Sequence, residues 1–232
     1  MQFSEFDSRR YRTVDVRTGY SEWAPTYEQT VQDAMDIALL DRLTGPSWSR
    51  ARRAIDLGCG TGRTAAWLTK RGVASIDGVD LTPEMLATAR ASGLYTNLVE
   101  GDVRSTGLEA GAYDLLTACL IDEHLPELGP LYREAWRLGS PGASFVLVSF
   151  HPQFMIATGM PTHFTARSGD PVAIATHIHL ISDHVEAGTA TGWTLAEMRE
   201  GTVNESWLAV KPKWRRFRGY PVSAAYTWRK PG

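Results

Sequence analysis

The feature that most constrains this chain is a regular alternation of short apolar runs and helix-like segments between residues 54 and 150. The apolar runs predict strands at 54–57, 75–79, 97–100, 113–120 and 144–150, and the intervening segments predict helices at 64–71, 83–91 and 128–138. Strands that alternate with helices in this way form right-handed βαβ units with parallel strands. The run 113–120 is apolar almost throughout, which is typical of a strand buried on both faces.

The segments outside this region predict further elements. Residues 29–43 have the apolar spacing of an amphipathic helix, which Gly45-Pro46 would end. Residues 151–176 are rich in Pro, Gly, His and Phe and predict a long loop, and loops of that length are usually functional. A helix near 179–187 and strands at 194–200 and 223–228 complete the chain, and the two strands suit a closing hairpin.

Composition excludes several classes of protein. The chain has 232 residues and is 43% apolar, as expected for a globular protein. Its formal net charge of −2 argues against a protein dedicated to binding polyanions. The two cysteines, Cys59 and Cys119, are too few for a disulfide framework. The first twelve residues are polar and charged, unlike a signal peptide, and no apolar run reaches the length of a membrane span. We therefore expect a soluble, cytoplasmic protein.

A glycine-rich turn after the first predicted strand is the strongest indication of a ligand. The run Asp56-Leu57-Gly58-Cys59-Gly60-Thr61-Gly62-Arg63 links a strand to a helix, where backbone N–H groups are free to bind a ligand. A dinucleotide fingerprint needs G-x-G-x-x-G, but here the third glycine comes one residue early. The carboxylate of Asp56 would also repel a pyrophosphate, whereas a ligand with an ammonium and a sulfonium would tolerate it.

Two more carboxylates follow predicted strands. Asp80 ends the second strand, where a carboxylate accepts hydrogen bonds from ribose hydroxyls in NAD and S-adenosylmethionine (SAM) proteins alike. Asp102 follows the third strand in Glu100-Gly101-Asp102-Val103 and is placed to accept from an adenine amino group.

With Asp56–Gly62, Asp80, Asp102 and the run Tyr113-Asp114-Leu115-Leu116, the chain resembles the class I SAM-dependent methyltransferases in four successive motifs across residues 50–150. The resemblance implies that SAM is the cofactor and S-adenosylhomocysteine (SAH) the product. The implied cofactor-binding residues are Tyr20, Tyr27, Asp56, Gly58, Cys59, Gly60, Thr61, Gly62, Asp80, Leu81, Met85, Gly101, Asp102, Val103, Cys119 and Leu120.

The same resemblance implies an organisation for the whole chain. It implies a Rossmann-like fold with a mostly parallel seven-stranded sheet and a C-terminal antiparallel hairpin. We expect a single methyltransferase domain over residues 1–232, with a helical lid at 1–50 that includes Tyr20 and Tyr27. The SAM-binding core would span 51–150, a substrate-cap insertion 151–178, and a C-terminal helix and hairpin 179–232.

Candidate general bases lie at the ends of the fourth and fifth predicted strands, where ligands bind in α/β sheets. They are Asp122, Glu123 and His124 after the fourth strand and His151 after the fifth, and the resemblance favours His124. His179, near the start of a predicted helix, is a candidate for contact with the substrate. Further histidines at 163, 177 and 184 raise the question of a metal, but no Cys or acid completes a site, so we predict none.

The substrate is expected to be a small aromatic or hydrophobic molecule, methylated at O, N or C. The sequence after the fourth strand, Ala118-Cys119-Leu120-Ile121, lacks the Pro-Pro motif of enzymes that modify nucleic-acid bases. Apolar residues after the fifth strand, with Trp23, Trp193 and Trp207, suit an apolar cap over the cofactor.

Two alternatives stay open. The tail after Leu208 has seven basic residues interleaved with Trp214, Phe217 and Tyr220, a pattern that an RNA methyltransferase would share. We favour a solvated hairpin face, and expect neither a membrane nor a nucleic-acid partner. The other alternative is a SAM-binding protein that transfers no methyl group.

Overall fold

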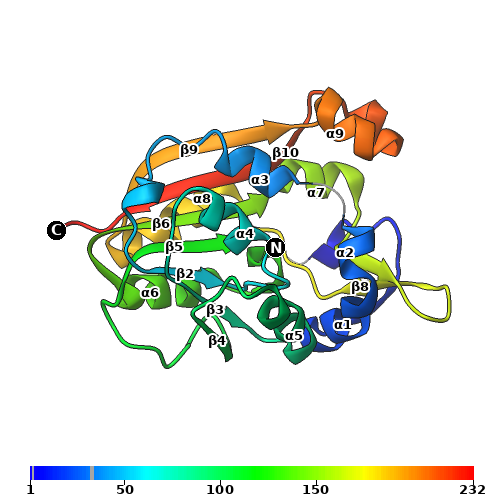
Figure 1. Cartoon of the computed structure of the whole chain (residues 1–232). Coiled ribbons are helices and arrows are strands. Elements are labelled where there is room, and N and C mark those ends of the chain that lie inside the picture. Colours follow the sequence, from blue (N-terminus) through cyan, green and yellow to red (C-terminus); the bar gives the residue numbers. More distant parts are fainter. Residues whose placement is uncertain (2, 32–33) are drawn as a thin grey trace.

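The computed structural model describes residues 1, 3–31 and 34–232, and its centre is a seven-stranded sheet in the order β4-β3-β2-β5-β6-β10-β9 (Figure 1). The strands are β2 (Ala54–Leu57), β3 (Ile76–Asp80), β4 (Asn97–Glu100), β5 (Tyr113–Cys119), β6 (Gly139–Phe150), β9 (Thr194–Thr202) and β10 (Pro221–Arg229). The strands from β4 to β6 are parallel, whereas β10 runs antiparallel to both β6 and β9. The predicted mostly parallel sheet with a C-terminal antiparallel hairpin is confirmed.

Helices cover both faces of the sheet because its central strands are apolar on both sides. The four residues of β2 are all buried. On one face, apolar side chains of α3 (Met35–Leu40) and α4 (Arg63–Lys70) form a core, and on the other face those of α6 (Gly129–Leu138) and α8 (Ile181–Thr191) do so. Each interface removes large side chains from water, which is the main stabilising term of such a layered fold.

A second, three-stranded sheet includes two parts of the predicted loop 151–176. It has the order β1-β8-β7, with β1 (Arg12–Val14) parallel to β8 (Pro171–Ile174) and β7 (His163–Thr165) antiparallel to it. The helix α7 (Pro152–Thr158) precedes this pair of strands. The prediction that residues 151–176 form a long irregular loop is therefore wrong. Strands of three or four residues are too short to show a clear alternation, and β1 lies far away in the sequence.

The helices of the N-terminal segment are shorter than the predicted one. Helices α1 (Val16–Trp23) and α2 (Tyr27–Thr30) come before α3, and the backbone leaves the helical region at Val31 and Ala34. The prediction of one continuous helix over residues 29–43 is therefore wrong. Residues 32–33 of that prediction lie outside the described part of the chain. In Figure 1, α1, α2 and β8 lie together at one end of the main sheet.

Smaller differences concern helix ends. Helix α5 (Pro83–Ser92) has Thr82 at its N-cap and proline in its first turn, but the Thr82 side chain makes no capping hydrogen bond. Helix α8 begins at Ile181, so His179 precedes the helix and its cap at Leu180. A short helix, α9 (Glu205–Val210), lies between β9 and β10. Within the described ranges, no helix has the length and apolar character needed to cross a bilayer.

Candidate functional site

The glycine turn between β2 and α4 forms an open cradle. Gly58, Gly60 and Gly62 have φ of +73°, +53° and +104°, which is the left-handed region that favours glycine. A Cβ on Gly58 would lie 2.4 Å from Ile121, whereas a Cβ on Gly60 would meet no atom within 4 Å. The backbone at Gly60 therefore faces open space, as expected where a ligand approaches the main chain.

Asp80 fixes this cradle to the end of β3. Its carboxylate accepts hydrogen bonds from the backbone N–H of Gly60 at 2.8 Å and of Thr82 at 2.9 Å. Burial raises the pKa of Asp80, while these two donors act in the opposite direction. The carboxylate keeps lone pairs for further donors, so its geometry suits the hydroxyls of a ribose.

Asp56 lies below the cradle rather than inside it. Its buried carboxyl accepts from the hydroxyls of Thr117 at 2.8 Å and Tyr95 at 3.0 Å. Burial raises its pKa to about 6. Asp56 lines none of the three cavities described below, so this geometry gives it the role of tying the base of the turn to β5.

Three cavities meet around this turn. The glycine-loop cavity has a volume of about 470 Å³ and is lined by residues 58–64, Cys119 and Tyr27. The Asp80 cavity, about 180 Å³, is lined by most of the remaining predicted cofactor residues: Tyr20, Leu81, Met85, Gly101, Asp102, Val103 and Leu120. The aromatic cavity, about 310 Å³, lies beyond Tyr20 and Leu120. The structure thus gathers the predicted cofactor residues around connected space, apart from Asp56.

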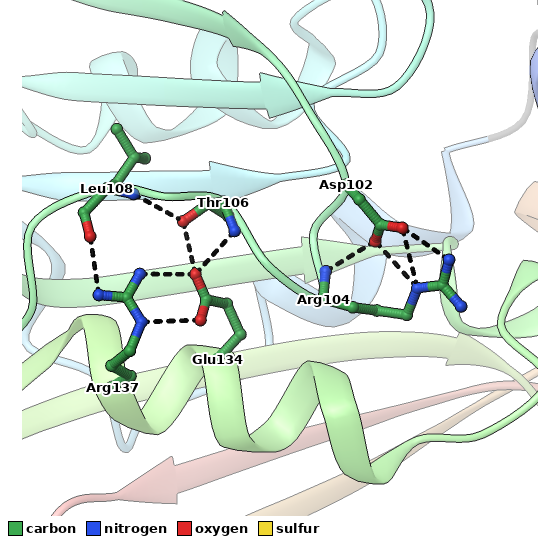
Figure 2. A network of polar contacts seen from close by, with 6 residues as sticks. All are labelled: Asp102, Arg104, Thr106, Leu108, Glu134 and Arg137. Carbon is green, nitrogen blue, oxygen red and sulfur yellow. Dashed lines mark hydrogen bonds and ion pairs between the residues drawn. The ribbon is translucent and has the colours of Figure 1, made fainter.

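Asp102 forms an ion pair with Arg104 that no sequence pattern indicated. Both of its carboxylate oxygens accept from the Arg104 guanidinium, which lowers the pKa of Asp102 (Figure 2). Both residues line the Asp80 cavity. Thr106, further along the same loop, donates hydrogen bonds to Glu134 of α6, and Glu134 also accepts from Arg137. This network fixes the loop against the helix.

Helix α1 covers the Asp80 cavity and is held there by two polar contacts. The Ser21 hydroxyl donates to Glu84 of α5 at 2.7 Å, and Arg17 forms an ion pair with Glu100 at the end of β4. Gly19 lets α1 approach β8, because a Cβ there would lie 2.6 Å from Ile174. The helix therefore presents Tyr20 to the cavity from a fixed position.

Leu120 separates the cofactor side from the aromatic cavity. It directly follows β5 and has φ of +57°, an uncommon conformation for a leucine. Its N–H donates to Val148 of β6 at 2.7 Å. Such strained residues cluster at ligand sites, where the surrounding structure holds them in place.

The Tyr20 hydroxyl and His124 form a pair next to this wall. His124 Nδ1 lies 2.8 Å from the carbonyl oxygen of Ala175, so Nδ1 carries the proton and Nε2 is an acceptor. Tyr20 donates to that Nε2 at 2.9 Å. Burial lowers the pKa of His124 to about 4, so the ring is neutral at physiological pH.

Glu123 brings a buried carboxyl group to the aromatic cavity. Its Oε1 lies 3.7 Å from His124 Nε2, and its Oε2 has no hydrogen-bond partner among the described residues. Burial, reinforced by the charge of Asp122, raises the pKa of Glu123 to about 8. A carboxyl group with such a pKa exchanges a proton near neutral pH.

The body of the aromatic cavity is apolar. Its lining includes Trp23, Phe154, Phe164, Trp207 and Trp214, drawn from α1, α7, β7, α9 and the turn that follows α9. Trp23 and Phe164 stack with ring centroids 5.7 Å apart. Aromatic surfaces of this kind suit a flat or hydrophobic small molecule.

The two other candidate histidines lie elsewhere. His151 caps α7, where Nδ1 accepts from the N–H of Gln153 and Nε2 donates to Glu200 at 2.9 Å. His179 donates from Nε2 to the carbonyl oxygen of Leu125 at 2.8 Å. Neither lines any of the three cavities, and the geometry therefore favours structural roles for both.

One cation that contacts all three cavities was missed. Arg63, the first residue of α4, lines each of them and forms an ion pair with the buried Asp36 of α3 at 3.0 Å. Arg63 is the last residue of the glycine motif. No pattern in the sequence indicated that Arg63 would form an ion pair with an acidic residue of another helix. Over the described ranges, no cluster of His, Cys, Asp or Glu could hold a metal ion.

Comparison with known proteins agrees with this site. Residues 55–147 match the family model of a methyltransferase domain. The chain is 25% identical to an uncharacterized methyltransferase from Emericella nidulans over 88% of this chain and 86% of that protein. A ubiquinone biosynthesis O-methyltransferase from Neisseria meningitidis serogroup C is 30% identical, over 44% of this chain and 45% of that enzyme.

The fold is shared with solved structures. A SAM-dependent methyltransferase from Mesorhizobium loti superposes with a TM-score of 0.67 at 23% identity, over 85% of this chain and 98% of that one. The matched family segment begins at β2 and ends within β6, so it contains the glycine turn, Asp80 and Asp102.

Proposed function

Because this chain belongs to the class I SAM-dependent methyltransferases, we propose that it methylates a small aromatic or hydrophobic metabolite. The observation that carries the proposal is the wall of Tyr20, Tyr27, Arg63 and Leu120 that the Asp80 cavity shares with the aromatic cavity. A cofactor on one side of this wall and an apolar acceptor on the other would meet at it. Binding two reactants in adjacent pockets removes much of the entropic cost of their reaction.

The cofactor side follows from the residues that line it. We propose that Gly58, Cys59, Gly60, Thr61 and Gly62 hold the methionine part, since their backbone encloses the glycine-loop cavity. Asp80 would bind the ribose. Leu81, Met85, Gly101, Asp102 and Val103 would surround the adenine, because they line the Asp80 cavity. When bound, SAM supplies a methyl group that its sulfonium has already activated.

The residues at the wall would handle the proton of the acceptor. We propose that His124, which is neutral with its proton on Nδ1, positions the Tyr20 hydroxyl. The oxygen of this hydroxyl would then accept a hydrogen bond from the methyl acceptor. Glu123 is the better proton acceptor, because its pKa of about 8 is close to working pH. As the acceptor oxygen or nitrogen gains the methyl group, its proton would pass to the Glu123 carboxylate.

The comparison supports oxygen as the acceptor atom, since one relative is named for O-methylation in ubiquinone biosynthesis. RNA methylation is less well supported. Trp214 and Phe217, which would have to stack on bases, are buried with exposed fractions of 4% and 8%. Both pack against Phe154, with ring centroids 5.3 and 5.9 Å away.

Calorimetric titration with SAM, SAH and NAD(H) tests the cofactor assignment. We expect micromolar binding of SAM and SAH, weakened about ten- to a hundredfold by Asp80→Asn, because a charged hydrogen-bond acceptor contributes about 1.5–3 kcal/mol. Asp114→Asn is the control, since this carboxylate accepts from the N–H groups of Arg52 and Arg53 at the opposite end of β5. Binding of NAD(H) alone would contradict the proposal. Release of SAH in a screen of phenols and amines would then identify the acceptor.

A further inference from the structure

The charges that line the aromatic cavity are mostly positive. Among the residues that the structure describes, Arg63, Lys211 and Lys213 contribute to its lining, together with one acidic residue, Glu123. Burial raises the pKa of Glu123 to about 8, which reduces the negative charge that this group carries near neutral pH. His163 also lines the cavity, and burial lowers its pKa. Arg63 is paired with Asp36, so the lysine side of the lining is the part that favours a ligand with an anionic group.

The two lysines lie away from the wall where transfer is proposed. Lys211 follows α9, and Lys213 belongs to the turn of 3-10 helix at Pro212–Phe217. Both line the aromatic cavity, and neither lines the Asp80 cavity or the glycine-loop cavity. A group bound by these lysines would therefore lie off the wall that the two cavities share.

Lys213 has cations and an aromatic ring as neighbours. Its ammonium lies 5.5 Å from the centroid of the Trp214 ring. Burial and the nearby charges of Lys211 and Arg9 lower its pKa. No carboxylate of the described residues lies within ion-pair distance of Lys213. Lys213 is an exposed residue at the lining of the cavity, and an anion bound there would offset the repulsion from the neighbouring cations.

A second group in the same lining lacks an acceptor. The indole Nε1 of Trp207 is buried and has no hydrogen-bond partner among the described residues. Trp207 lines the aromatic cavity together with Lys213. A buried N–H without an acceptor is costly, and a ligand oxygen would satisfy it.

We propose that the methyl acceptor is a flat apolar molecule with an anionic group, such as a carboxylate or phosphate, at the end remote from the methylated atom. Lys213 binds the anion, the rings of Phe154, Phe164 and Trp214 enclose the body, and the acceptor atom faces Tyr20. This inference rests on the proposed function for the identity of the acceptor, whereas the anion site itself is a property of the cavity.

Calorimetry on the SAH-saturated protein tests it with matched pairs of acids and primary amides. The probes are 4-hydroxyphenylacetate, 4-hydroxycinnamate and 6-hydroxy-2-naphthoate, each with its amide. We expect at least one acid to bind about tenfold more tightly than its amide, as for a charge-assisted hydrogen bond. Lys213→Met should abolish this preference, and Lys213→Arg should retain it. Arg216→Met is the matched control, because Arg216 lies over Phe217 in the same turn but lines none of the cavities.

Equal binding of every acid and its amide, absence of binding by all six compounds to protein that binds SAH, or a preference unchanged by Lys213→Met would each overturn the anion site. Methyl transfer from SAM is assayed in parallel to separate the two proposals. Lys213-dependent acid binding without any SAH formation from SAM would support the anion site and contradict the proposed function. Methylation of neutral acceptors only, at a rate unchanged by Lys213→Met, would support the function and contradict the anion site.

Discussion

The Tyr20 hydroxyl donates to His124 Nε2 at 2.9 Å, and this contact joins the covering helix α1 to the turn that follows β5. The carbonyl oxygen of Ala175 fixes the other nitrogen of the ring. Three segments distant in the sequence therefore meet at the His124 ring, next to the wall between the two ligand cavities.

Removal of that hydroxyl should affect turnover more than cofactor binding. We expect Tyr20→Phe to lower kcat by about a hundredfold with any acceptor that carries a proton, because the hydroxyl that would position this acceptor through a hydrogen bond is lost. The affinity for SAH should change little, since the ring remains in place. Tyr220→Phe is the control, because Tyr220 is 40% exposed and lines none of the cavities. Steady-state kinetics and calorimetry provide the measurements, and equal kcat values for Tyr20→Phe and the wild type would refute the role of the hydroxyl.

The raised pKa of Glu123 should make stability depend on pH. Between its unfolded value of about 4.5 and its folded value of about 8, the folded protein binds more protons than the unfolded chain, so stability falls as pH rises. This single group contributes a slope of up to about 1.4 kcal/mol per pH unit.

Chemical unfolding of the wild type and Glu123→Gln between pH 6.5 and 8 checks this expectation. Asp56, with a raised pKa of about 6, and His124, with a lowered pKa of about 4, titrate mainly below that window in the folded state and are present in both proteins. The variant should show a flatter dependence of the free energy of unfolding on pH. Parallel curves for the two proteins would mean that Glu123 ionises normally.

Two glycines of the cradle should respond differently to alanine. Gly58→Ala places a Cβ 2.4 Å from Ile121, so we expect a clear loss of thermal stability. Gly60→Ala meets no atom, so its cost should be limited to the positive φ, about 1–2 kcal/mol. Because its Cβ enters space assigned to the cofactor, SAH binding should nevertheless weaken strongly. Thermal unfolding with and without SAH separates the two effects, and a Gly60→Ala protein that SAH stabilises as much as the wild type would contradict the assignment.

The position of α1 should depend on one close approach. Gly19→Ala would put a Cβ 2.6 Å from Ile174 of β8, which forces the helix away from the second sheet and Tyr20 away from His124. We expect lower activity and lower stability. Ile174→Ala removes the obstructing atoms, so the double variant should lose less than the sum of the two single variants. Strict additivity in a double-mutant cycle would show that the two residues do not interact.

The central sheet could be predicted because its signals are local. Most strands from β2 to β6 contain a short apolar run, the glycine turn directly follows β2, and Asp80 is the last residue of β3. The second sheet could not be predicted in this way, since β1 pairs with residues of β8 far along the chain and both strands are short. The same limit applies to the site. Arg63 and Lys213 become informative only when folding brings them to cavities whose other walls come from distant elements.

The pairing of β1 with β8 has a consequence for synthesis of the protein. During translation, β1 and α1 emerge before their partner strand, which exists only after β6 has been made. The parallel core can associate in the meantime, because its strands follow one another closely. The helix that carries Tyr20 is therefore expected to dock late, and a ribosome-bound chain that ends before β8 should contain the glycine cradle without its cover. Closure of the site would then depend on the second half of the chain having left the ribosome.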